Sequence, residues 1–256
     1  SGSGGVTQFS FLNSFLISRK LSFGADMMLL FGAIDRDVTR SGITINQNSS
    51  AMKLSFAAGL QYRENISGDL SLSLGVVDGH SCDLGFENNL IVMNGSGDIL
   101  LNDAIASSSI DIPRSYGAGI SLSGKRFTVA TDYRYQRWSL AMTDYPGFSF
   151  TDTHRCSTGI MFTPARYATG GFLNRLLYQG GFAVSNSYLT INGINPVRYE
   201  FSTGAGIPFR NGSQINIGLS WGRLGTTAEG LIKEDYLRLT LNLSLAERMF
   251  FRRMYE

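Results

Sequence analysis

The stretch Tyr236-Leu-Arg-Leu-Thr-Leu-Asn-Leu-Ser-Leu245 alternates apolar and polar residues without a break after its first position. Successive side chains of an extended strand point to opposite faces, so the five leucines share one face and the four polar residues between them share the other. In a soluble β-sandwich the leucines would face the core. In an outer-membrane barrel they would face lipid, and the polar residues would face a watery lumen. This strand alone leaves both architectures open.

The same alternation recurs along the chain and predicts about eleven strands. Leu54–Tyr62 and Leu70–Val76 alternate in this way and are joined by a short turn, which is typical of a β-hairpin. Tyr199–Ile207 alternates as well, and the Asn-Gly turn within Arg210–Ser213 connects it to Ile215–Trp221. An all-β fold over residues 1–256 is therefore expected.

The connections between these strands are alternately short and long. We predict long loops at Asp35–Ser50, Asp78–Asp111, Ala141–Thr153 and Asn186–Pro196. Short periplasmic turns and longer external loops alternate in this way in bacterial barrels, whereas a soluble sandwich has no reason to keep its long loops at one end. The pattern favours a transmembrane antiparallel up-and-down β-barrel in the outer membrane of a bacterial cell.

Composition agrees with this fold class and narrows the function classes. The chain has 256 residues, of which 43% are hydrophobic, and its mean hydropathy of -0.00 is what half-polar strands would average to. The longest apolar run, Met27–Ile34, is far shorter than the roughly 20 residues that a membrane helix needs. A net charge of only +2 argues against a nucleic-acid partner.

Charged residues fall on the predicted polar faces, where they would point into a lumen. Lys53, Arg134 and Arg198 are candidates to hold the carboxylate of a ligand. The alternative is that these cations pair with acidic residues of the same faces, which are Asp26, Asp132 and Glu200. Both roles remain open from the sequence.

Apolar residues in polar surroundings are the other candidates for ligand contact. The predicted loop Asp78–Asp111 carries Ile99, Leu100, Leu101 and Ile105 at its centre. Such a cluster either packs on other loops or meets an apolar ligand. Two further apolar residues, Met28 and Leu30, interrupt a polar face, where they either line an apolar route or contact a plug.

Catalytic and metal chemistry find little support. The only His and Cys residues are His80, His154, Cys82 and Cys156, so we expect no metal and no cofactor. His154 near Asp152 resembles a base with its orienting group, but no nucleophile motif accompanies it, and we predict that the protein is not an enzyme. A disulfide between the two cysteines is possible in an exported protein, and two free thiols are the alternative.

Several stretches resemble the C-terminal part of the FadL-type outer-membrane channels for long-chain fatty acids and aromatic hydrocarbons, in the form seen in Bacteroidota. The stretches that carry this resemblance are Gly2–Gly5, Met28–Ile34, Ser187–Gly193, Gly204–Phe209, Ile215–Gly222, Gly225–Thr227, Leu231–Tyr236 and Met249–Arg253. The resemblance covers essentially the whole chain. It also makes the Gly-Ser run at the start native rather than a linker.

The resemblance implies a barrel of about fourteen strands with an N-terminal hatch inside. Eleven strands would then leave three strands and the hatch upstream of Ser1, so we expect the chain to be the C-terminal portion of a longer protein. The odd strand count points the same way, because bacterial single-chain barrels usually have even numbers. The resemblance also implies an apolar entry groove between Asp35–Ser50 and Asp78–Asp111.

The sequence therefore predicts an outer-membrane channel for passive uptake of hydrophobic small molecules such as long-chain fatty acids or aromatic hydrocarbons. Its expected partners are outer-membrane lipid and the hydrophobic ligand. A second hypothesis is a structural or accessory barrel subunit of a larger outer-membrane complex, with other outer-membrane or periplasmic subunits attached. A third is a rim hydrolase that depends on His154.

Overall fold

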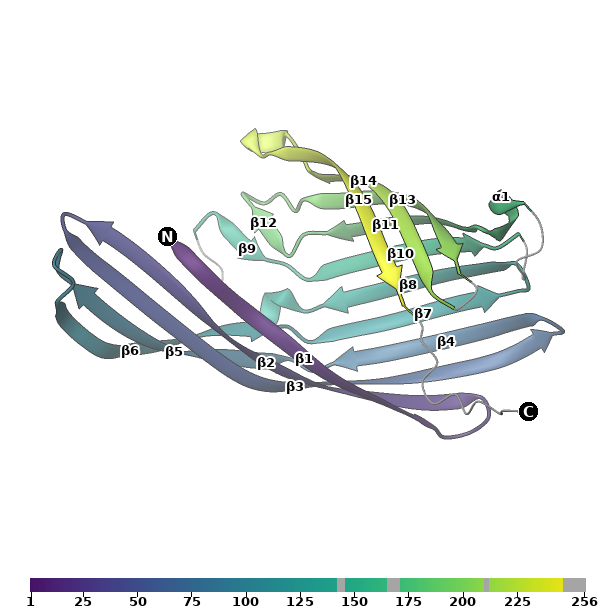
Figure 1. Ribbon diagram of the computed structural model, residues 1–256, viewed down its shortest axis with the longest axis horizontal. Coiled ribbons are helices and arrows are strands. Elements are labelled where there is room, and N and C mark those ends of the chain that lie inside the picture. The colour runs from purple at the N-terminus through teal and green to yellow at the C-terminus, as the bar shows by residue number, and fades with distance from the viewer. Residues whose placement is uncertain (142–145, 165–170, 210–211, 246–256) are drawn as a thin grey trace, which may run out of the picture. The chain divides into compact units, whose positions relative to one another are not determined.

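The computed structural model describes residues 1–141, 146–164, 171–209 and 212–245, and most of these are in strands (Figure 1). The strands are β1 (Gly2–Leu16), β2 (Leu21–Arg40), β3 (Ile43–Ser67), β4 (Leu70–Gly79), β5 (Cys82–Met93), β6 (Ile99–Ile112), β7 (Ser115–Ser123), β8 (Phe127–Gln136), β9 (Phe148–Phe150), β10 (Thr153–Phe162), β11 (Leu177–Asn186), β12 (Leu189–Ile191), β13 (Val197–Pro208), β14 (Gln214–Gly225) and β15 (Lys233–Ser244). The helical elements are η1 (Trp138–Leu140), α1 (Phe172–Arg175) and η2 (Ala228–Gly230).

Eleven of these strands follow one another in a single sheet, in the order β1-β2-β3-β4-β7-β8-β10-β11-β13-β14-β15. Each of these strands pairs with the one before it on this path, as an up-and-down topology requires. Two further strands belong to the same sheet off this path, because β5 pairs with β3 and β6 pairs with β5. The prediction of about eleven strands in an antiparallel up-and-down barrel is confirmed. In the described part of the chain, no helix has the length and hydrophobicity to cross a membrane.

The chain divides into two compact units, which share several strands. The first comprises Ser1–Gln61, Val76–Gly117 and Tyr135–Asp152. The second comprises Tyr62–Gly75, Ala118–Arg134 and Thr153–Glu256. The external hairpins described below belong to the first unit, and the lumen-facing cavity belongs to the second.

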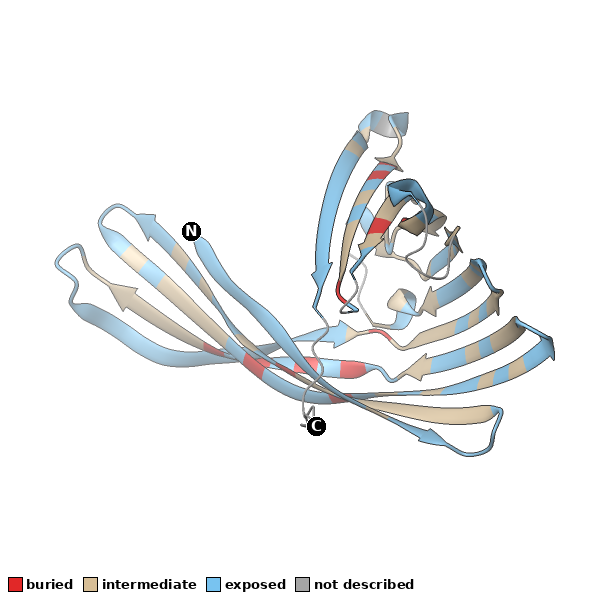
Figure 2. Cartoon of the chain, turned by 45° about the vertical axis from the view of Figure 1, so that its right-hand side comes forward, coloured by how far each residue is buried: buried red, intermediate tan, exposed pale blue. Residues whose placement is uncertain are grey.

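The leucines of β15 decide between the two architectures that its alternation left open. Leu237, Leu239 and Leu241 are 69%, 74% and 72% exposed, although they form the apolar face of the strand. Figure 2 shows the same for the sheet as a whole, because buried positions occur only as short red segments. A soluble sandwich would bury these leucines, so that alternative is wrong, and the apolar face is the lipid face of a barrel.

Aromatic side chains form a row across the apolar face of the C-terminal strands. The register pairs Phe182 with Phe201, Phe201 with Trp221, and Trp221 with Leu237. Ring centroids lie 4.7 Å apart in the first pair and 6.0 Å apart in the second. Such cross-strand aromatic pairs stabilise a sheet and fix its register.

The predicted loop Asp35–Ser50 is a regular hairpin, which corrects the sequence analysis. β2 has 20 residues and β3 has 25, about twice what a tilted strand needs to cross a bilayer. Their turn has positive φ at Ser41 (51°) and Gly42 (78°), as a tight two-residue hairpin turn requires. Both strands therefore continue well beyond the membrane.

Polar side chains join the two strands of this extension. The side-chain amide of Asn46 donates to Asp37 at 2.6 Å, and that of Asn48 donates to Asp35 at 2.6 Å. These cross-strand pairs stabilise the polar face of the hairpin, and the other face mixes Val38, Ile43 and Ile45 with polar residues. The alternation that marks a membrane strand is absent here, which is why the segment looks like a loop in the sequence.

The predicted loop Asp78–Asp111 is also a hairpin, built from β5 and β6. β5 pairs with the outer part of β3, from Thr44 opposite Met93 to Ala51 opposite Phe86. β6 then pairs with β5 from Cys82 opposite Ile112 onward, with an irregularity between Phe86 and Asn88. β9 and β12 lie within the other two predicted long loops, Ala141–Thr153 and Asn186–Pro196. Residues 142–145, 210–211 and 249–253 of the predicted segments lie outside the described residues.

A small hydrophobic cluster forms where β5 meets β2 and β3. Its buried members are Leu30, Ala51, Cys82, Leu84 and Phe86, and Ile112 packs against them. β5 buries every second residue from Cys82 to Asn88 and exposes those between. This alternation gives the β5 to β6 hairpin a defined inner face, which matters for its role below.

Candidate functional site

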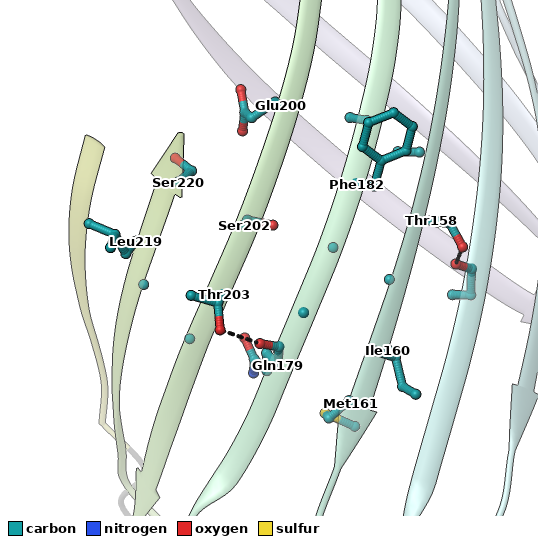
Figure 3. Close-up of a pocket in the computed structure, with 18 of the residues that line it drawn as sticks. Thr158, Ile160, Met161, Gln179, Phe182, Glu200, Ser202, Thr203, Leu219 and Ser220 are labelled. Atoms are coloured by element: carbon teal, nitrogen blue, oxygen red, sulfur yellow. Dashed lines mark hydrogen bonds between the residues drawn. The ribbon is translucent and has the colours of Figure 1, made fainter. Parts of the chain in front are cut away.

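A hollow of about 610 Å³ lies along the second unit and is lined by residues of β8, β10, β11, β13, β14 and β15 (Figure 3). One row of its lining runs Gly159, Gly181, Ser202, Ser220 and Arg238, which are paired in this order across five strands. Four of these five residues are glycine or serine. Their small side chains leave space above the sheet, and this space is the cavity.

Charged groups line part of the cavity. Asp132, Arg155, Glu200 and Arg238 all line it. Most of the other lining residues also belong to the polar faces predicted from the sequence. Most of the accessible lining surface is nevertheless apolar, so the cavity has a mixed character.

One side-chain network holds the rim of this cavity. The Tyr236 hydroxyl donates to the Glu200 carboxylate at 2.7 Å, from two strands away. Gly222 lies between them in the register, and a Cβ there would come within 2.2 Å of the Tyr236 ring. The guanidinium of Arg238 lies 5.4 Å from the centre of the same ring. Because Gly222 has no side chain, the ring of Tyr236 can lie over the backbone of β14 and its hydroxyl can reach Glu200. The sequence analysis did not single out Tyr236 or Gly222.

A second hollow of about 580 Å³ lies along β1, β2 and β3 in the first unit. Phe11, Phe15, Met27 and Phe56 contribute to its lining, which is mainly apolar. Phe11 and Met27 are directly paired, and Phe15 lies on the same face of β1. This is the apolar face of the sheet, so lipid chains would fill the hollow in a membrane.

The predicted contact residues Ile99, Leu100, Leu101 and Ile105 all lie on β6. They are 60%, 59%, 46% and 37% exposed, and none of them lines either of these hollows. The structure therefore brings them together, but as an exposed surface of the external hairpin. Their contact with a ligand stays a prediction.

The two apolar residues on the polar face of β2 differ from each other. Leu30 is 8% exposed and packs in the cluster with Leu84 and Phe86, so it contacts another part of the chain. Met28 is half-buried and is paired with Ser10 of β1. The two roles that the sequence left open for these residues, lining an apolar route or contacting a plug, stay predictions.

The three predicted carboxylate-binding cations are not gathered into one site. Lys53 lies exposed on β3, and Arg134 lies exposed on β8. Arg198 is half-buried on β13, which two strands separate from β8 in the sheet order. None of the three lines the cavity of the second unit. Glu200, one of their predicted ion-pair partners, accepts a hydrogen bond from Tyr236 instead.

Both members of the formal catalytic pair have other partners. The Asp152 carboxylate accepts hydrogen bonds from the Tyr135 hydroxyl and from Ser139, whose amide lies at 3.0 Å and whose hydroxyl lies at 2.6 Å. Desolvation acts to raise the pKa of Asp152, but the hydrogen bonds from Ser139 and Tyr135 outweigh it and hold the pKa below its usual value. His154 Nδ1 shares a hydrogen bond with the Tyr133 hydroxyl at 2.7 Å.

The cysteines and acidic groups do not form a chemical centre. Cys82 and Cys156 are both free thiols, the first buried and the second exposed. Within the described ranges, no group of three or more His, Cys, Asp or Glu side chains is placed to hold a metal ion. The arrangement thus offers surfaces for contact, in the form of a polar lumen wall and an external apolar hairpin.

Solved structures with a similar fold are membrane channels. The CymD monoaromatic hydrocarbon channel matches with a TM-score of 0.61 and 16% identity, over 95% of this chain and 73% of that one. The Pseudomonas putida toluene transporter TodX gives 0.53 and 16%, over 95% and 69%. A Pseudomonas aeruginosa FadL homologue gives 0.56 and 14%, over 87% and 60%. At these identities the likeness shows the fold, and it supports the resemblance to FadL-type channels at that level.

The family assignment comes from the sequence and differs from the one expected. No curated protein matches the chain. The family model that matches is BamG, and it covers residues 1–256, which is the whole chain. The protein is therefore a β-barrel with a FadL-like fold that belongs to the BamG family.

Proposed function

We propose that this protein is a barrel of the bacterial outer membrane that acts as a structural subunit of a larger outer-membrane protein complex. The observation that carries this proposal is the hairpin of β5 and β6, which presents Ile99, Leu100, Leu101 and Ile105 to solvent. Contiguous apolar residues on the outside of a protein mark an interaction surface more often than they are left bare.

The position and charge of the hairpin support a protein partner over lipid. It pairs with the part of β3 that extends beyond the length needed to cross the bilayer. The hairpin also carries five acidic residues, which are Asp83, Glu87, Asp98, Asp103 and Asp111. Carboxylates are unfavourable in hydrocarbon and are repelled by anionic lipid phosphates. An apolar surface with this charge fits a protein.

The lumen is compatible with the same function, because charged groups line its described cavity. A channel for hydrophobic molecules needs an apolar path, whereas Asp132, Arg155, Glu200 and Arg238 surround this cavity. Leu30, which would have lined such a path, is covered by packing against β5. These features suit a barrel whose main work is done by its outer surfaces.

Passive uptake of hydrophobic small molecules is the second candidate function. It is favoured by the fold of the chain. The fold neighbours include a monoaromatic hydrocarbon channel and a toluene transporter. Long-chain fatty acids or aromatic hydrocarbons would be the substrates of this chain, and outer-membrane lipid would surround it in either function.

The experiment that tests the proposal is extraction of the full-length protein from its native membrane in a mild detergent, followed by size analysis. We expect it to migrate as part of a larger complex. A variant with residues 88–105 replaced by a short Gly-Ser turn should leave the complex but still fold. A control shortened at residues 39–44, in the neighbouring hairpin tip, should stay in it.

The opposite results would refute the subunit function. A wild-type protein that migrates alone, in cells whose uptake of a labelled long-chain fatty acid depends on it, would support the channel instead. Loss of the complex in the control variant alone would also count against the role of the β5 to β6 hairpin. Folding of each variant is checked by its heat-dependent shift in gel electrophoresis.

A further inference from the structure

We propose that β6 is a docking edge to which an extended, positively charged segment of a partner protein adds as a further strand. This inference rests on the proposed subunit function and specifies the partner and its mode of binding. It is argued from the free edge of β6, from the apolar face that β6 shares with β5, and from the charge of the hairpin.

The first observation is the edge itself. Among the described strands, β6 pairs with β5 alone, although it lies in the interior of the chain. Thirteen of its fourteen residues are exposed. A strand flanked on one side presents a row of unpaired N–H and C=O groups, which is a template for another strand. Strand addition to such an edge is a common way to bind an extended segment.

The second observation is an apolar face that ends abruptly at β6. On β5, Leu84 and Phe86 are each 4% exposed, because they pack in the cluster with Leu30, Ala51 and Cys82. The register pairs Leu84 with Ile110, which belongs to the same face but is 45% exposed. Leu101 and Ile105 continue this face with 46% and 37% exposure. Apolar side chains on one more strand beside β6 would pack against these residues on the same face and reduce their exposure.

The third observation is the charge of the hairpin, which selects the partner. Residues 81–112 contain five acidic residues and no Lys or Arg, so their formal charge is 0 minus 5, or −5. Asp83 and Asp111 even lie directly opposite each other in the register, where like charges repel. A second copy of this hairpin would bring −5 against −5. Lysine or arginine side chains on the added strand would relieve this repulsion.

These observations define the occupant. It is a segment of a different protein, up to about the 14 residues of β6 in length. One face of the segment carries apolar residues that pack against Leu101, Ile105 and Ile110, with a basic residue near Asp103, which lies on that same face, and a second basic residue on the opposite face lies near Asp111. Its backbone completes the hydrogen bonds of the edge.

The first test uses photoreactive amino acids placed singly at Asn102, Ala104 and Ser109 of the full-length protein in its native membrane. Strand addition predicts that the crosslinks move along one segment of one partner protein, in the same order and with matching spacing, and that this segment contains Lys or Arg. Crosslinks to lipid, to a second copy of this chain, or to scattered partner positions would overturn the proposal.

The second test reverses the charge of the edge. D103K and D111K should each weaken retention in the complex by about fivefold or more in low salt, an effect that added salt reduces. E87K makes the same change on β5, one strand away from the edge, and should have a clearly smaller effect. Equal effects of the three variants would refute docking at β6.

The outcomes separate the two proposals. If the wild-type protein migrates in a complex but the crosslinks do not move in register, strand addition is wrong and the subunit function stands. If the wild-type protein migrates alone, the subunit function fails and the docking edge fails with it. Each variant is first shown to fold by its heat-dependent gel shift.

Discussion

Arginine at the centre of the β15 lipid face should destabilise the protein strongly, and only on that face. Trp221 and Leu237 are paired, and the next pair on the same face is Arg223 with Asp235. These two residues form an ion pair with an N to O distance of 2.7 Å, which marks the polar end of this face. With Leu245 at the other end of the leucine run, Leu241 lies near the middle of the bilayer, and it is 72% exposed.

The magnitude follows from this depth. Arginine on the lipid face costs about 2–4 kcal/mol at the midplane and about 0–1 kcal/mol near an interface. Leu241→Arg should therefore lower the folding equilibrium constant about 30- to 700-fold, and Leu237→Arg by about fivefold or less. Asn242→Arg places the same cation on the polar face of the same strand, where it should change the free energy of unfolding by less than about 0.5 kcal/mol.

Urea unfolding of the full-length protein in lipid vesicles, followed by tryptophan fluorescence, measures these differences. Trp221 reports directly, because it is paired with Leu237. Equal costs for Leu241→Arg and Asn242→Arg would refute the assignment of the two faces. A flat profile from position 237 to position 241 would refute the depth argument, because a membrane gradient is then absent.

Three further outcomes follow from the contacts described. Tyr236→Phe should lower the free energy of unfolding by about 1 kcal/mol, because the half-buried hydrogen bond to Glu200 is lost, and a double-mutant cycle with Glu200→Gln should recover most of that value. Gly42→Ala should cost about 1 kcal/mol in the same urea assay, because φ at this turn is +78° and alanine resists that conformation. The protection factor of the Ser139 amide is the exchange rate of the unstructured peptide divided by that of this amide at the same pH. It should be high above about pH 4 and should fall as pH falls through the lowered pKa of Asp152, since a depressed carboxyl pKa stabilises the folded loop only while the group is ionised. Asp152→Asn should remove this pH dependence.

Alternation within a strand was enough to predict much of the fold. The leucines of Leu237–Leu245 fix a two-residue period, and the same period elsewhere gives the strand path. What alternation could not give is the extent of the hairpins outside the membrane. At Asn46 and Asn48 both faces meet water, so the polar pairing with Asp37 and Asp35 leaves no hydrophobic period to detect.

The candidate site was predicted less well, because it depends on register between strands. Tyr236 meets Glu200 across Gly222 only because β13, β14 and β15 align those three positions. A shift of the register by one residue would change every such cross-strand contact, and the sequence of a single strand does not specify the register. The exposed cluster at Ile99–Leu101 was visible in the sequence, but its place on a free edge was not.

The continuity of β3 gives the external hairpin a mechanical link to the barrel. The strands that face β3 are interrupted between Gly79 and Cys82, whereas β3 itself runs unbroken from Ile43 to Ser67. Its outer half pairs with β5, and the backbone amide of His80 still donates to Phe56 at 3.0 Å beside the interruption. A force applied to the hairpin is therefore transmitted along the continuous backbone of β3 into the membrane-spanning part of the sheet.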